Sequence, residues 1–76
     1  MKYRIVNLYI ETARDLIETL GDNVVRCIAW HDASCVDVDI NPSMSILKIN
    51  DGKLTIDVGA KLFTIPYEDY ASIEIL

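Results

Sequence analysis

The sequence has few of the residues on which disordered, disulfide-rich or membrane-spanning chains depend. Its 76 residues include three glycines and two prolines, too few for a linker in a chain that is 51% hydrophobic. Two cysteines allow at most one disulfide bond, which excludes a disulfide scaffold. No apolar run approaches the length of about 20 residues that a membrane-spanning helix needs. Residues 1–76 are therefore predicted to form a single folded domain.

Cations are scarce as well, above all in the second part of the chain. Seven Lys and Arg stand against twelve Asp and Glu, which gives a net charge of −5. Residues 1–26 are neutral, so the whole acidic excess lies in residues 27–76. Binding to a phosphate backbone depends on Lys and Arg. We therefore expect no direct contact with nucleic acid and no contact with a membrane.

The beginning of the chain also lacks the features of a secretory signal. Asn7 and Glu11 interrupt its apolar residues, and no small-residue cleavage site follows them. We therefore expect a cytoplasmic protein with reduced cysteines. Its mean hydropathy of +0.22 is high for so small a domain, because a chain of this size buries only about 60–65% of its unfolded surface. This apolar excess indicates self-association or a protein-binding face.

Residues 2–6 are rich in β-branched and aromatic side chains, which predicts a strand. A helix follows, because apolar residues recur at helical spacing and charged residues fall between them. The apolar stripe consists of Tyr9, Ala13, Leu16, Ile17 and Leu20. Gly21 is well placed to end this helix.

The start of the helix falls between Leu8 and Thr12. Thr12 and Asp15 have the spacing of a weak capping box, which favours the later start. Ile5 also fits the helical stripe, so one long N-terminal helix is the alternative.

Strands dominate the rest of the chain. Residues 24–30 are apolar on both faces apart from Arg26, which predicts a central or sandwiched strand. Residues 31–34 form a short connection. The next strand is half-buried, because apolar residues at 36, 38 and 40 alternate with Asp37 and Asp39. Residues 41–43 form a turn.

A hairpin is predicted around Asp51 and Gly52, a pair that suits a two-residue turn. Four cross-strand pairs follow from it: Asn50 with Lys53, Ile49 with Leu54, Lys48 with Thr55, and Leu47 with Ile56. This register gathers the apolar residues on one face, which are Leu47, Ile49, Leu54, Ile56 and Val58.

The remaining elements are short. Residues 59–60 suit another tight turn, and residues 61–65 a strand that ends at Pro66. Residues 67–70 suit a turn or a single helical turn, and residues 72–76 a last strand. The fold class is therefore α+β, with one amphipathic N-terminal helix packed on a small antiparallel β-meander of five or six short strands. Such a meander could curl into a small barrel.

Three aspartates are candidate functional residues. Asp37 and Asp39 share one face of a strand, and Asp57 is expected on the same face of the sheet. Paired carboxylates can bind Mg²⁺ or Ca²⁺ or transfer protons. Lys48 and Lys53 are expected on that surface too, which favours a solvated face with cross-strand ion pairs. Otherwise it is an acidic patch that docks on a basic partner.

Aromatic residues beside acidic ones form the second candidate, at Tyr67, Glu68, Asp69 and Tyr70. Tyr and Trp are favoured anchors of protein interfaces, so these four residues are predicted to bind a partner together with the three aspartates. Trp30 is expected to lie in the core.

A third cluster combines Cys27, His31 and Cys35, with Asp32 beside it. Thiolates and imidazole suit zinc, yet structural zinc sites need four ligands. A Cys–His nucleophile pair would also need an oxyanion hole and a pocket. Two buried free cysteines and a loop histidine are the simpler interpretation. We therefore predict no metal, no cofactor and no catalytic residue.

The leading hypothesis is a small acidic protein, not an enzyme, that occupies the surface of a partner protein. A basic nucleic-acid-binding groove is one such surface, and compact acidic inhibitors of this size are common among viral and mobile-element proteins. The alternative is a homo-oligomer that binds a small ligand between its subunits, which would complete the core. A zinc-stapled domain is the third hypothesis.

Overall fold

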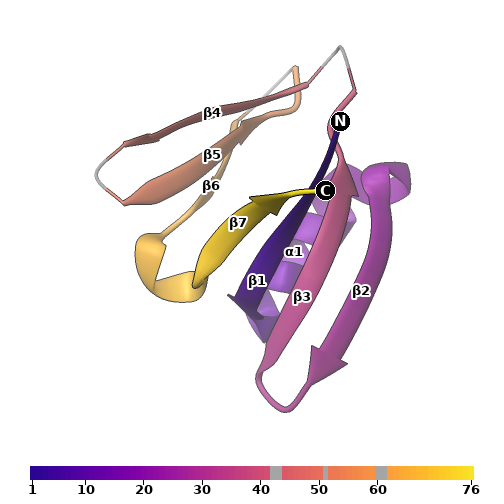
Figure 1. Ribbon diagram of the computed structural model, residues 1–76, viewed down its shortest axis with the longest axis vertical. Coiled ribbons are helices and arrows are strands. Elements are labelled where there is room, and N and C mark those ends of the chain that lie inside the picture. The colour runs from indigo at the N-terminus through magenta and orange to yellow at the C-terminus, as the bar shows by residue number, and fades with distance from the viewer. Residues whose placement is uncertain (42–43, 51, 60–61) are drawn as a thin grey trace.

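The computed structural model describes residues 1–41, 44–50, 52–59 and 62–76 (Figure 1). Two of its elements, η1 and η2, are single turns of 3-10 helix. The order along the chain is β1 (Lys2–Tyr9), α1 (Ile10–Leu20), η1 (Gly21–Asn23), β2 (Val24–Trp30), β3 (Ala33–Asp39), β4 (Ser45–Asn50), β5 (Lys53–Asp57), β6 (Leu62–Ile65), η2 (Tyr67–Asp69) and β7 (Ser72–Ile75). The fold is α+β, as the sequence predicts.

The strands form two antiparallel sheets. One sheet has four strands in the order β2-β3-β1-β7, and the other has three in the order β4-β5-β6. The described residues thus contain seven strands instead of five or six, and the sheets do not join into a closed barrel. The predicted meander is also incomplete, because β1 lies between β3 and β7 and so pairs with strands far along the chain.

β1 contains a bulge that places two core residues on the same face. Ile5 pairs with Val36, whereas Leu8 pairs with Ser34, so β1 has one extra residue in between. Within this bulge Asn7 has a φ of +53°, a conformation that Asn tolerates better than most residues. Without the bulge, residues 5 and 8 would point to opposite faces. Their helical spacing is therefore compatible with a strand, and the alternative of one long helix is wrong.

The helix α1 begins at Ile10, between the two predicted starts, and ends at Leu20 as expected. Gly21 has a φ of +52° and donates its backbone N–H to the carbonyl oxygen of Ile17. The capping box is wrong, because the helix starts before Thr12 and has no side-chain cap. The Thr12 hydroxyl instead donates to Asp69 Oδ2 at 2.6 Å.

The prediction of a central strand at residues 24–30 is wrong, because β2 is an edge strand. Its residues 25–29 are all exposed. β2 joins β3 through a two-residue turn in which His31 has a φ of +57°. Primed hairpin turns need such a positive φ at their first position. In this strand, apolar residues on both faces therefore occur at an exposed edge of the sheet and not at its centre.

The hairpin of β4 and β5 keeps only part of the predicted register. Asn50 pairs with Lys53 as expected, and Asp51 lies outside the described residues. The register then shifts by one, so that Ile56 pairs with Ile46 instead of Leu47. The predicted positions 42–43 and 60–61 also lie outside the described residues, as do the side chains of Trp30, Leu47, Lys48 and Ile49.

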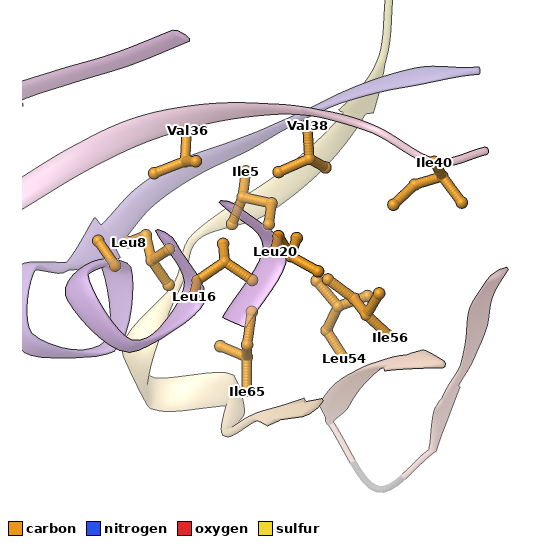
Figure 2. Packing of buried hydrophobic residues seen from close by; sticks show 11 residues of the cluster. Ile5, Leu8, Leu16, Leu20, Val36, Val38, Ile40, Leu54, Ile56 and Ile65 are labelled. Atoms are coloured by element: carbon orange, nitrogen blue, oxygen red, sulfur yellow. The ribbon is translucent and has the colours of Figure 1, made fainter. Parts of the chain in front are cut away.

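The core lies between the four-stranded sheet on one side and α1 with the three-stranded sheet on the other (Figure 2). Buried apolar side chains from all these elements meet there: Ile5, Leu8, Ala13, Leu16, Leu20, Val36, Val38, Ile40, Leu54, Ile56 and Ile65. We call the face of the four-stranded sheet that carries Val36 and Val38 its inner face. The opposite, outer face is covered by no element among the described residues (Figure 1).

Candidate protein interface

Asp37 lies on the outer face but is almost fully buried, with 7% of its surface exposed. Arg4, its direct partner on β1, binds it with two hydrogen bonds. Arg4 Nε lies 2.8 Å from Asp37 Oδ1, and Arg4 Nη2 lies 3.1 Å from Oδ2. Bidentate pairs of this kind are the strongest that Arg forms with carboxylates. The geometry therefore fixes Asp37 within its own chain.

The Arg4–Asp37 pair also fixes the charge of both groups. The hydrogen bond from Arg4 lowers the pKa of Asp37 below its ordinary value, against the opposing effect of burial, and Arg26 lowers it further. The bond to Asp37 raises the pKa of Arg4. A general acid or base works best with a pKa near neutrality. These shifts are in the opposite direction, so this pair suits binding better than proton transfer.

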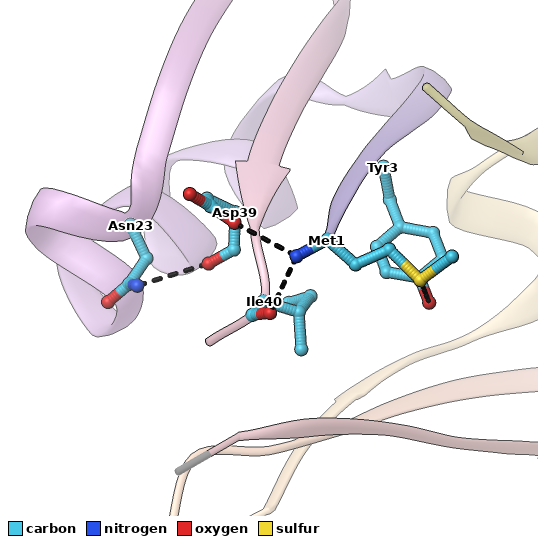
Figure 3. A network of polar contacts seen from close by, with 5 residues as sticks. All are labelled: Met1, Tyr3, Asn23, Asp39 and Ile40. Carbon is cyan, nitrogen blue, oxygen red and sulfur yellow. Dashed lines mark hydrogen bonds and ion pairs between the residues drawn. The ribbon is translucent and has the colours of Figure 1, made fainter. Parts of the chain in front are cut away.

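Asp39 stands at the end of β3 and is half exposed (Figure 3). The amino group of Met1 lies 3.3 Å from its Oδ1 and 3.1 Å from the carbonyl oxygen of Ile40. Asn23 donates from its side chain to the backbone oxygen of Asp39 at 3.1 Å. These contacts tie the ends of β1 and β3 together and hold Asp39 beside Lys2, its cross-strand partner.

The third aspartate is not part of this face. Asp57 ends β5, in the other sheet, where its Oδ1 accepts the backbone N–H of Gly59 at 2.8 Å. The prediction that Asp37, Asp39 and Asp57 share one face of one sheet is therefore wrong. Of the two lysines expected beside them, Lys53 is exposed on β5.

The segment of residues 67–70 forms η2 and the residue after it, in agreement with the predicted turn. Tyr67 is 65% exposed and Glu68 is exposed, whereas Tyr70 packs against the core. The bond from Thr12 fixes Asp69 to α1. On the other side, a Cβ at Gly52 would come within 2.9 Å of Tyr67 Cβ, so the two chain segments touch there. Whether this segment binds a partner stays a prediction.

The two cysteines lie on opposite faces of the four-stranded sheet. Cys27 pairs with Val36 of the inner face, and Cys35 pairs with Ile28 on the outer face. His31 is at the tip of the hairpin. In the part of the chain that is described, no three His, Cys, Asp or Glu residues group as metal ligands. The cysteines are also less buried than expected, because Cys27 is exposed and Cys35 is half-buried.

The outer face carries a row of alternating charge that sequence reasoning missed. Arg26 pairs with Asp37, Asp37 with Arg4, and Arg4 with Glu74, so the row crosses all four strands. A second row beside it pairs Asp39 with Lys2. Each strand therefore contributes charges of one sign: positive on β2 and β1, negative on β3 and β7. No sequence pattern shows this arrangement, because it depends on which strands pair and in which register.

Toward the β2–β3 hairpin the outer face becomes apolar. Ile28 is 46% exposed and pairs with Cys35, and Tyr9 is 44% exposed and pairs with Ala33. A half-open pocket of about 180 Å³ lies beside Ile28. It is lined by Asn7, Ile28, Ala33, Ser34 and Cys35. We define the interface candidate as this apolar region together with the charged rows.

Among the described residues, no helix is both long and apolar enough to cross a membrane. No family model, no curated protein and no solved structure matches this chain.

Proposed function

We propose that this chain is a small non-enzymatic protein-binding module that contacts its partner through the outer face of the four-stranded sheet. One observation carries the proposal. The outer face is uncovered among the described residues, yet it combines exposed apolar side chains such as Ile28 with a pocket and with charges of fixed position. Exposed apolar areas rimmed by polar groups are typical of protein interfaces.

The two parts of the face have different roles in binding. The apolar region around Ile28 and Tyr9 supplies the area whose burial drives association. The charged rows select the partner and its orientation, because complementary charge contributes more to specificity than to affinity. Since Arg4 already holds Asp37, the row does not have to reorganise when a partner binds.

Photo-crosslinking at position 28 tests the proposal. A photoreactive amino acid replaces Ile28, and the chain is irradiated in its own host cells. We expect a covalent adduct with another polypeptide. The matched control carries the same group at Glu18, an exposed position of α1 on the other side of the sheet, and should give no adduct. Equal yields from both positions, or no adduct from position 28, would contradict the proposal.

A second candidate is an inhibitor that docks on a basic groove through η2. The exposed pair of Tyr67 and Glu68 favours it, because both are presented on a turn held between Thr12 and Gly52. Replacing Glu68 with Lys should then weaken capture of a basic partner, and more so at low salt than at high salt. Capture that is independent of this charge would exclude the electrostatic part of this candidate.

A further inference from the structure

The alternating charges of the outer face are complementary to themselves in one orientation. The strand order is β2-β3-β1-β7, with charges positive, negative, positive and negative. A two-fold axis parallel to the strands, between β3 and β1, exchanges β3 with β1 and β2 with β7. Arg26 of one copy then faces Glu74 of the other, and Arg4 faces Asp37. In the second row, Lys2 faces Asp39.

The other simple orientation is unfavourable. A two-fold axis across the strands would place every residue of the row over itself, so that Arg26 would face Arg26 and Glu74 would face Glu74. Like charges in contact oppose association. The charges therefore select the axis parallel to the strands. That axis keeps the strands of the two sheets aligned, which is a common way for two sheets to pack face to face.

The apolar region fits the same axis. Because β3 and β1 exchange, Ala33 of one copy faces Tyr9 of the other, and Cys35 faces the bulged part of β1. Ala33 and Cys35 line the pocket of about 180 Å³, and Tyr9 is 44% exposed. A cavity of about 150 Å³ is large enough for benzene. The pocket of each copy can therefore receive the phenol ring of the other copy.

We infer that the outer face binds a second copy of this chain, face to face, about a two-fold axis parallel to the strands between β1 and β3. The inference rests on the proposed function, because it names the partner of the same face. Two independent features support it: accessible charges that are opposite where the copies face each other, Arg26 to Glu74 and Lys2 to Asp39, and a pocket opposite an exposed tyrosine. The apolar contacts provide the driving force, and the charges determine the orientation.

A charge-exchange experiment tests the inference. The solution mass of the wild-type chain is measured by light scattering over micromolar to millimolar concentrations, and we expect a dimer. R26E and E74R are each expected to weaken it by about tenfold or more, because each places like charges together at two symmetric positions. An equal mixture of the two variants should recover the dimer. In the mixed dimer the carboxylate introduced by R26E faces the guanidinium introduced by E74R, and the unchanged Glu74 and Arg26 face each other.

Recovery in the mixture also shows that both variants fold. Within one copy, residues 26 and 74 lie on opposite edge strands, about 14 Å apart at the usual strand spacing, so recovery must come from contacts between copies. Dimers that persist equally in both single variants, or a mixture that stays monomeric, would overturn the arrangement. Y9A should weaken the dimer because it removes the ring from the pocket. Y67A, at an exposed tyrosine outside the face, is the matched control and should not.

The inference and the proposed function can fail separately. A wild-type chain that stays monomeric at millimolar concentration overturns the second copy as partner. Crosslinking from position 28 to a different protein would then still support the proposed function. The absence of any adduct from position 28 contradicts the proposed function itself.

Discussion

On the inner face of the four-stranded sheet, Ile5, Val36 and Val38 have no exposed surface, whereas Ile28 on the outer face keeps 46% of its surface exposed. The two faces come from alternate residues of the same strands. The inner face packs against α1 and the three-stranded sheet (Figure 2). The outer face has no such cover among the described residues. The sheet thus supplies the core on one side and a candidate interface on the other.

The two faces also differ in how their buried polar side chains are hydrogen-bonded. Ser34, a buried polar residue on the inner face, donates its hydroxyl to the carbonyl oxygen of Leu8 at 3.3 Å. Asp37 on the outer face is also buried, with 7% of its surface exposed, and Arg4 binds its carboxylate. Burying a charge without a partner is costly. A carboxylate that is shielded and paired in this way restricts which surfaces can pack against the outer face.

Leu16→Ala should have the largest effect, because it removes packing from the inner face. Leu16 is fully buried, and such a change costs about 2–5 kcal/mol of unfolding free energy. That is a large part of the stability of a small domain. Denaturant unfolding followed by circular dichroism measures the loss. Ile28→Ala, on the outer face, should cost less than about 1 kcal/mol in the monomer. Equal losses would show that the two faces do not differ as described.

Asn7→Val should have the next largest effect on stability, because it destabilises the bulge that places both Ile5 and Leu8 on the inner face. A β-branched residue at a φ of +53° is strained, and we expect a loss of about 1–2 kcal/mol in unfolding free energy. Asn7→Gly accepts this φ and is the control. If the Val variant unfolds at the same denaturant concentration as wild type, the bulge does not depend on this conformation.

Gly21→Ala should have a smaller effect at the end of the helix that covers the inner face. No atom beyond its chain neighbours lies within 4 Å of a Cβ built at Gly21, so the cost comes from the local backbone conformation, with a φ of +52° and a ψ of −114°. We expect a loss of about 1 kcal/mol, again from denaturant unfolding. Thr19→Ala, near the end of the same helix, is the control for a small change there. A stabilised Gly21→Ala variant would contradict this conformation.

The sequence predicted local structure well where one residue type has one physical role. The apolar stripe from Ala13 to Leu20 predicted α1, Gly21 predicted its end, and Gly52 predicted the hairpin turn. The prediction for residues 24–30 was wrong, because an apolar strand has the same composition in the middle of a sheet and at an exposed edge. Only the pairing of β1 with β3 and β7, which depends on tertiary packing, decides between the two.

The candidate site was less predictable for the same reason. Asp37 and Asp39 were correctly placed on one face of a strand, but their partners Arg4 and Lys2 are more than 30 residues away and come from β1. A register shift of one residue changes every facing pair, and the structure has such a shift at the bulge near Asn7. The charged rows exist only once strand order and register are both known.

Asp37→Asn should have the smallest effect of the four, because the Arg4 end of the pair is partly exposed and screened by water. This substitution is informative because its effect on the free energy of unfolding should depend on pH. The pKa of Asp37 is lowered from 3.8 in the folded chain, so the contribution of the pair to stability is fully present above about pH 5 and is lost as the pH falls through 3.8 toward the folded pKa. The difference in unfolding free energy between wild type and Asp37→Asn should therefore be largest near neutral pH and should decrease toward zero in acid. Asp15→Asn, at an exposed carboxylate of α1, controls for the loss of one charge. A difference that stays constant from pH 7 to pH 3 would mean that Arg4 does not stabilise Asp37 as an anion, and the outer face would lose the fixed charge that separates it from the inner one.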